Sequence, residues 1–194
     1  MKIGLISDTH SAGSGRDLPD KVLRALSGVD LILHCGDLEC LGVLDYLETV
    51  APVLAVRGYE DPVEKGDRLA YATRVVRTGG VAIGMIHDIQ WPGPRVATTS
   101  DGAGLVLPEG RAAETLGKKF GQPVDVVLFG DTHEELVCRW DGVLMVNPGS
   151  PTYPGSRHPR GSLGTIAMLE IGGAEAFARI INLEELETGE KAAL

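Results

Sequence analysis

The sequence predicts an α/β fold, because short apolar runs that end at glycine or polar residues alternate with segments of helical spacing. Of the 194 residues, 43% are hydrophobic and 26 are glycine. This composition can form a core and favours many tight turns over a helical bundle. The length suits one domain, which we expect over residues 1–183, followed by a charged and frayed tail over residues 184–194.

Five apolar runs in the first two thirds of the chain are short and closed by turn residues, as buried strands are. They span residues 2–7, 31–35, 52–56, 81–86 and 124–129. Three intervening segments, 20–27, 41–47 and 111–120, are predicted to be helices.

The last third of the chain is predicted to be mainly strand. The expected strands span residues 136–140, 143–146, 163–171 and 176–183, and Asp141-Gly142 favours a hairpin between the first two. Residues 91–110 contain three prolines and are expected to form a long loop, which in compact domains is often functional or mobile.

The net charge of −9 disfavours general binding to nucleic acids or anionic membranes. No apolar run approaches the roughly 20 residues of a membrane helix. Cys35, Cys40 and Cys138 are odd in number and scattered, and they are expected to be structural thiols rather than metal ligands. Together with a start that lacks a cleavage pattern, this predicts a cytoplasmic protein.

Acidic and histidine residues follow several of the predicted strands directly. They are Asp8, His10, Asp37, His87, Asp131 and His133. The carboxyl ends of strands in an α/β sheet face a common crevice, so we expect these side chains to converge there. Mixed carboxylate and imidazole ligands suit Mn²⁺, Fe or Zn²⁺ better than Ca²⁺. The two remaining histidines are expected elsewhere: His34 buried or beside the ligands, and His158 on the surface.

The chain resembles the calcineurin-like metallophosphoesterases, in particular their small bacterial and archaeal phosphodiesterase branch. The resemblance covers residues 1–171 and rests on an ordered set of motifs: Asp8-x-His10, Gly36-Asp37, Arg57-Gly58-x-x-Asp61, His87, Gly130-x-Thr-His133 and Asn147-Pro-Gly-Ser150. It implies a four-layer α/β/β/α sandwich with two central mixed β-sheets. It also implies a two-metal site that hydrolyses phosphoesters, with manganese expected and iron, zinc or nickel as alternatives.

The resemblance also implies which residues bind each metal. Asp8, His10 and His133 match ligands of the first ion, Asp37 matches the carboxylate that bridges both ions, and His87 matches a ligand of the second.

The second site departs from the family pattern at two positions. Tyr59 stands where the family has asparagine, and Asp131 stands where it has histidine. A carboxylate at position 131 can still bind a metal, whereas Tyr59 is expected to pack in the turn. Glu60 or Asp61 could reach the second ion instead, so the occupancy of that site is left open.

The implied activity is hydrolysis of a small phosphodiester or other phosphorylated substrate by a metal-bound hydroxide, with Asp37 and His87 as catalytic residues. Glu60 stands where many relatives have a histidine that protonates the leaving group, and Asp61 is a further catalytic candidate. Weak acid assistance favours diesters with good leaving groups over monoesters.

The turn from Asn147 to Ser150 is expected to line the substrate crevice. Direct contact of Ser150 with phosphate is the alternative role for this turn.

Two other functional interpretations remain open beside the phosphodiesterase. The scaffold subunit of the retromer complex resembles this fold and has altered metal positions, so the chain could be a degenerate, metal-binding interaction protein, and a homo-oligomer is compatible with either role. A metallohydrolase with a non-phosphate substrate is the third interpretation. The intact first site favours the enzyme, because a pure scaffold has no physical need for it.

Overall fold

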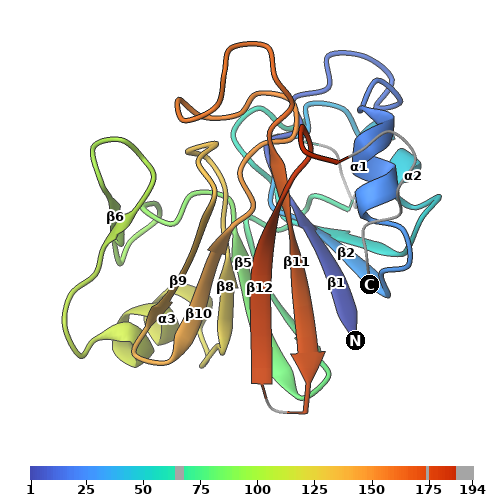
Figure 1. Cartoon of the computed structure of the whole chain (residues 1–194). Helices are drawn as coiled ribbons and strands as arrows, with labels where there is room; N and C mark the ends of the chain where they lie inside the picture. The colour runs from blue at the N-terminus through green and yellow to red at the C-terminus, as the bar shows by residue number, and fades with distance from the viewer. Residues whose placement is uncertain (64–67, 174, 187–194) are drawn as a thin grey trace.

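The computed structural model describes residues 1–63, 68–173 and 175–186, and two five-stranded β-sheets form its centre (Figure 1). The first sheet has the order β12-β11-β1-β2-β3. Its parallel strands are β1 (Lys2–Ile6), β2 (Leu31–His34) and β3 (Val53–Ala55), and β11 (Thr165–Gly172) and β12 (Glu175–Asn182) complete it as an antiparallel pair. Ile6 pairs with His34 and His34 with Ala55, so the three parallel strands end side by side.

The second sheet has the order β4-β5-β8-β10-β9. Its parallel centre consists of β5 (Val81–Ile86), β8 (Val126–Leu128) and β10 (Val143–Asn147). The edges are the antiparallel strands β4 (Thr73–Thr78) and β9 (Leu136–Trp140). Strand β4 was not predicted. Its sequence, TRVVRT, is only partly apolar because an edge strand of this kind exposes one face to solvent.

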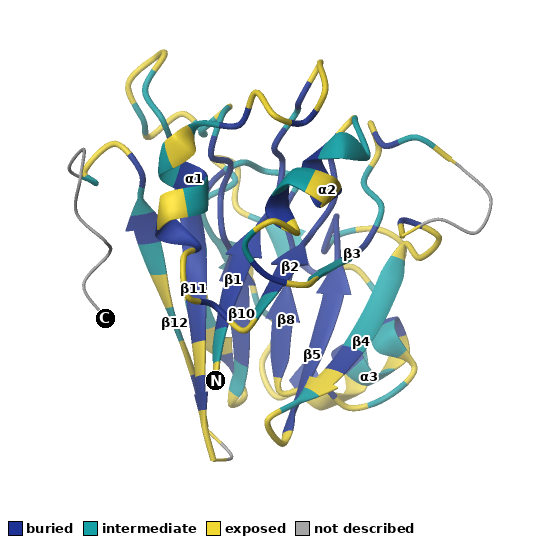
Figure 2. Cartoon of the chain, turned by 90° about the vertical axis from the view of Figure 1, so that its right-hand side faces the viewer, coloured by how far each residue is buried: buried dark blue, intermediate teal, exposed yellow. Residues whose placement is uncertain are grey.

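Helices cover the outer faces of both sheets. Figure 2 shows α1 (Asp20–Ala25) and α2 (Gly42–Leu47) in front of the first sheet, and α3 (Ala112–Phe120) packs against the second.

Three apolar clusters fill the spaces between the layers. One joins Val22 and Leu44 to Ile32 of the first sheet, the second lies between the sheets, and the third joins Leu116 to Met145 of the second sheet. The predicted four-layer α/β/β/α sandwich with two mixed sheets is therefore confirmed.

Some predicted boundaries differ from the observed ones. Helix α1 ends at Ala25 rather than at residue 27, and Gly28 follows with a φ of +80°, a conformation that glycine adopts readily. The predicted loop 91–110 contains a small hairpin of β6 (Ala97–Thr98) and β7 (Leu105–Val106).

At the predicted tail, Glu184 accepts a hydrogen bond from the backbone N–H of Leu163, while residues 187–194 lie outside the described residues. Among the described residues, no helix has the length and apolar character needed to cross a membrane.

Candidate metal centre

The loops that follow β1, β2, β5 and β8 meet at one end of the two sheets, and they carry the six predicted metal ligands. Backbone hydrogen bonds join the loops in pairs. The N–H of Asp8 donates to the carbonyl of Gly36 at 2.9 Å, and that of His10 donates to the carbonyl of Asp37 at 3.0 Å. The N–H of Gly130 donates to the carbonyl of His87 at 2.8 Å. The polar side chains therefore converge across both sheets, as expected from their positions after strands.

The backbone of these loops is unusual at the predicted ligands themselves. Asp8, His10, Asp37, Asp131 and His133 have φ values of +53°, +40°, +54°, +69° and +60°. Residues with a Cβ adopt this left-handed region at a steric cost, which proteins tolerate mainly at functional sites. The loops also approach closely at Gly130, where a Cβ would collide with the side chains of Ser7 and Asp8. The chain thus accepts strain to bring these side chains together.

The first group of side chains is formed by Asp8, His10 and His133, whose ligand atoms lie within 4.8 Å of one another. The Nε2 atoms of His10 and His133 are 3.1 Å apart. The Nδ1 of His133 donates to the carbonyl of Tyr153 at 2.6 Å, and the Nδ1 of His10 lies 2.8 Å from a carboxylate oxygen of Glu39. These outer contacts place the Nδ1 proton in each neutral ring, so two Nε2 lone pairs face each other. A cation between them fits this arrangement.

The second group is formed by Asp8, Asp37 and His87, whose ligand atoms also lie within 4.8 Å of one another. The Nδ1 of His87 donates to the carbonyl of Cys35 at 2.8 Å. Its Nε2 is buried and lies 3.1 Å from Asp37 Oδ2, yet it makes no hydrogen bond of good geometry with any described residue. Asp131 Oδ1 is 3.9 Å from the same nitrogen. A buried nitrogen directed at carboxylates is what a second cation would need.

The electrostatics of the group also fit a cation. Burial disfavours the charged form of His87, but the nearby carboxylate of Asp37, 3.1 Å away, and the charge of Asp8 outweigh it and raise the pKa of His87 to about 9. Burial raises the pKa of Asp8, and burial together with the charge of Asp88 raises the pKa of Asp131. In the metal-free protein, therefore, the proton on His87 helps to balance the negative charge of the clustered carboxylates. A metal ion that binds to this nitrogen must displace that proton.

Tyr59 is held by a residue that the sequence analysis did not identify. Its hydroxyl donates to Asp88 Oδ2 at 2.8 Å, and its ring lies edge-on to His87 at 5.4 Å. Burial and the bond to Asp88 raise the pKa of Tyr59 to about 12. Asp88 is itself buried, and its other oxygen accepts the backbone N–H of Gln90. The position of Asp88, directly after the predicted ligand His87, is the feature of the sequence that could have indicated its role.

Asp61, which was predicted as a catalytic candidate, is hydrogen-bonded only to backbone groups among the residues that the structure describes. Its two oxygens accept hydrogen bonds from the N–H groups of Asp37, Leu38, Glu39 and Gly58 at 2.7–3.0 Å. The carboxylate therefore ties the loop after β2 to the loop after β3 and positions Asp37. The neighbouring Glu60 is exposed, and its backbone N–H donates to Asp37 Oδ1 at 2.9 Å.

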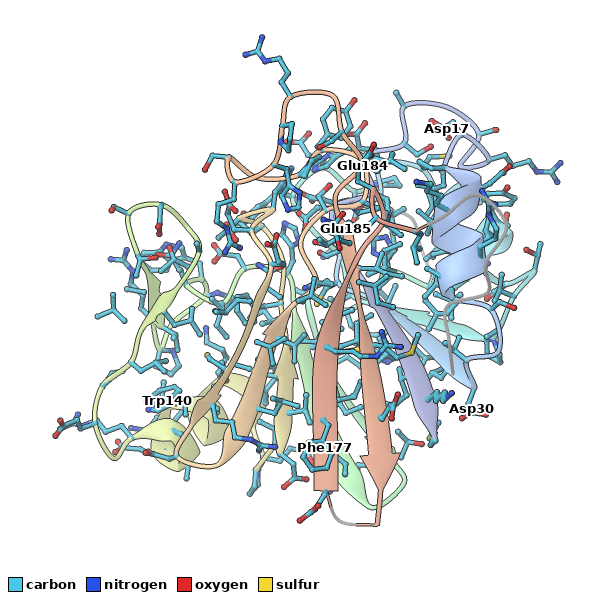
Figure 3. The ribbon with its side chains drawn as sticks, viewed as in Figure 1. Asp17, Asp30, Trp140, Phe177, Glu184 and Glu185 are labelled. Atoms are coloured by element: carbon cyan, nitrogen blue, oxygen red, sulfur yellow. The ribbon has the colours of Figure 1, made fainter. Side chains whose placement is uncertain are left out.

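Replacement of Asp61 by asparagine is expected to destabilise the metal-free protein by about 3 kcal/mol, because an amide cannot accept four hydrogen bonds and its NH₂ group faces donors. Urea unfolding would measure this. Asp30→Asn is the matched control, because Asp30 is exposed beside β2 (Figure 3) and, within the described part of the chain, its carboxylate accepts only the N–H of Lys2. Equal stability of the Asp61 and Asp30 variants would contradict the positioning role.

Asn147 and Ser150 lie beneath the site and are fully buried. The amide of Asn147 donates to the carbonyl of Gly130, and the hydroxyl of Ser150 donates to the carbonyl of Asp8. Both side chains are thus used to hold the ligand-bearing loops. Direct contact of Ser150 with phosphate stays a prediction, since the hydroxyl is engaged with Asp8 in this structure.

The other predicted outcomes concern two histidines and a cysteine. His34 is fully buried, as predicted; its Nδ1 accepts the N–H of Gly36, its Nε2 donates to Thr9, and burial lowers its pKa to about 4. His158, expected at the surface rather than among the ligands, belongs to neither group of candidate ligands; it is partly buried, with its side chain 10% exposed and paired with Glu135 at 3.0 Å. Cys35 is a buried thiol that donates to the carbonyls of Ile86 and Leu128.

Comparisons with known proteins identify the family of the chain. A model of the calcineurin-like phosphoesterase superfamily domain matches residues 1–173. A probable metallophosphoesterase of Methanocaldococcus jannaschii is 34% identical, over 95% of this chain and 83% of the relative. A phosphodiesterase of the same organism is 28% identical, over 77% of this chain and 83% of the relative.

A solved structure provides a further comparison. Vps29 from Entamoeba histolytica, in a structure described as a complex with zinc, has a TM-score of 0.65 at 23% identity and covers 94% of this chain and 99% of its own. The family model spans nearly the whole chain and includes every converging side chain described above. The chain therefore belongs to the calcineurin-like phosphoesterase superfamily.

Proposed function

We propose that the chain is a metal-dependent phosphodiesterase that holds two divalent ions. Asp8, His10 and His133 would bind the first ion, Asp37 would bridge both, and His87 with Asp131 would complete the second. When bound, the ions would activate water for attack on phosphorus and neutralise charge on the phosphoryl oxygens. The single observation that carries this proposal is the pair of facing Nε2 atoms of His10 and His133, 3.1 Å apart beside the buried Asp8.

The residues of the chain do the remaining work by holding groups in place. Glu39 and the carbonyl of Tyr153 orient the two imidazoles of the first site through their Nδ1 atoms. Cys35 orients His87 through its carbonyl oxygen, and Asp61 holds the loop that carries Asp37. Such outer contacts fix the ligands before the metal arrives, so little reorganisation is needed on binding.

A diester is favoured over a monoester for two reasons. Glu60, which stands where many relatives have a histidine acid, is exposed to solvent, so the leaving group receives little help from it. A substrate with a good leaving group needs less help. One relative is also named a phosphodiesterase. Manganese is the proposed metal because carboxylates outnumber imidazoles at the second site, while the zinc described for the Entamoeba structure makes Zn²⁺ the first alternative.

The decisive experiment joins metal analysis of the purified protein to hydrolysis of bis-p-nitrophenyl phosphate with Mn²⁺ added. We expect release of p-nitrophenolate that depends on Mn²⁺ and stops when a chelator is added. If metal-loaded protein binds two ions but hydrolyses no diester under any metal, the enzyme proposal fails. The alternative, a metal-binding interaction protein of the same fold, would then be preferred.

The two ions are expected to bind with different affinities. The first site has all four ligands of the family pattern, whereas Tyr59 in the second is committed to Asp88. Calorimetric titration of the metal-free protein with Mn²⁺ should show one tight ion and a second that binds at least about tenfold more weakly. Two equally tight ions would contradict this, and would indicate that Asp131 fully replaces a histidine.

A further inference from the structure

A cavity of about 480 Å³ opens directly beside the second group of the metal centre. It lies at the junction of the loop after β3 and the segment after β5. The residues that matter for its chemistry are Arg57, Tyr59, His87, Asp88, Trp91 and Pro92. Because His87 belongs to both the proposed metal centre and the cavity wall, an ester group on a phosphorus held at the centre could extend into this space. The volume is within the range of sites for small organic ligands.

Two aromatic side chains on this cavity are unusually exposed. Tyr59 is 63% exposed and Trp91 is 58% exposed, although large aromatic groups normally bury most of their surface. Both are nevertheless held in position. Asp88 accepts the hydroxyl of Tyr59 at 2.8 Å, and the guanidinium of Arg95 lies 6.0 Å from the centroid of the Trp91 ring. Rings that are exposed but held in this way offer preformed apolar faces to a ligand.

The charged groups of the cavity narrow the chemistry of the ligand. The two oxygens of Asp88 already accept hydrogen bonds from Tyr59 and Gln90. Arg57, by contrast, makes no side-chain hydrogen bond or ion pair with any described residue, so its guanidinium is a free cation in the wall. A neutral or anionic aromatic group with hydrogen-bond acceptors matches both the ring faces and the free guanidinium.

We propose that this cavity binds a flat aromatic ester group of the substrate, such as an aryl group or a nucleobase, with Trp91 and Tyr59 as specificity-determining residues. The proposal rests on the phosphodiesterase function above, because it takes the metal centre as the place where the phosphorus is held. It adds the class of organic group that the enzyme selects. The aromatic faces contribute most of this selection, and Arg57 adds a polar contact at the wall.

The test compares two phosphonates that differ only in the organic group. Calorimetry on Mn²⁺-loaded protein would measure the dissociation constants of phenylphosphonate and methylphosphonate. We expect the wild type to bind phenylphosphonate about tenfold more tightly. Trp91→Ala should reduce this preference to about twofold, and Trp91→Phe should restore most of it because a ring face returns.

Phe177→Ala is the matched control, because Phe177 is an exposed aromatic residue on β12, at the surface in Figure 3, and it does not line this cavity. It should keep the full preference of the wild type. Equal binding of the two phosphonates by the wild type, including no binding of either, would overturn the proposal, and so would an unchanged preference in Trp91→Ala. A clear phenyl preference without any diester hydrolysis would support the cavity assignment while refuting the phosphodiesterase function.

Discussion

Asp37→Asn is expected to remove most of the bound metal and to lower diesterase activity at least about 100-fold. Asp37 is the one residue proposed to touch both ions, and its carboxylate lies 3.1 Å from the buried Nε2 of His87. Although burial opposes ionisation, the nearby imidazole of His87 and its charge lower the pKa of Asp37, so the carboxylate is ionised and ready for a cation. Asparagine keeps the shape and tolerates a φ of +54°, but it lacks the charge.

The measurement is metal content per chain by elemental analysis after gel filtration, together with hydrolysis of bis-p-nitrophenyl phosphate. Asp45→Asn is the control, because Asp45 is an exposed carboxylate on α2 that pairs with Arg68. It should retain wild-type metal content and activity. Circular dichroism would show that both variants are folded. A folded Asp37→Asn protein with unchanged metal content would count against the whole site.

The double substitution Tyr59→Asn with Asp131→His should strengthen the second metal site at least about tenfold. An asparagine oxygen is a neutral ligand, and imidazole suits Mn²⁺ or Zn²⁺. In the wild type, Tyr59 is tied to Asp88 and burial raises the pKa of Asp131, so both positions resist metal binding. Calorimetric titration should show a tighter second ion. Hydrolysis of bis-p-nitrophenyl phosphate is compared in the single variant Asp131→His, which keeps the ring of Tyr59 on the cavity, and it should be faster at limiting Mn²⁺.

The single substitutions separate the contribution of position 59 from that of position 131. Tyr71→Asn is a control, because Tyr71 is exposed and does not line the cavity beside the centre. If the wild type is already active and Asp131→His alone is slower, Asp131 is an adapted ligand and the chain is a specialised enzyme. If both forms bind metal but neither hydrolyses any diester, the interaction-protein alternative gains support.

The position of the metal centre could be predicted from the sequence because its ligands follow strands. Asp8, Asp37, His87 and His133 stand at or within a few residues of the ends of apolar runs, and parallel strands end at the same edge of a sheet. Strand β4 was missed because its exposed edge position allows Arg74 and Arg77 among the valines, which weakens the apolar signal. Similarly, the half-buried pairing of His158 with Glu135 depends on a contact between separate segments.

The roles of the supporting residues could not be predicted in the same way. Asp61 accepts hydrogen bonds from four backbone N–H groups of two loops, and no spacing along the chain predicts this. Tyr59 and Asp88 are 29 positions apart in the chain. Their hydrogen bond holds Tyr59, which replaces the asparagine of the family pattern, as an aromatic wall of the cavity. Such roles depend on which loops are neighbours, and hydrogen bonding between loops is set only when the sheets pack.

By itself, the sequence determined the alternation of strands and helices, the end of the sheets at which the chemistry lies, and the set of metal-ligand candidates, because hydrophobic periodicity and residue type act locally. The tertiary structure alone decided that His10 and His133 face each other, that Asp61 positions a loop, and that Tyr59 and Trp91 share a cavity beside His87. Those outcomes depend on distances between segments far apart in the chain, which are fixed only when both sheets pack face to face and their loops meet.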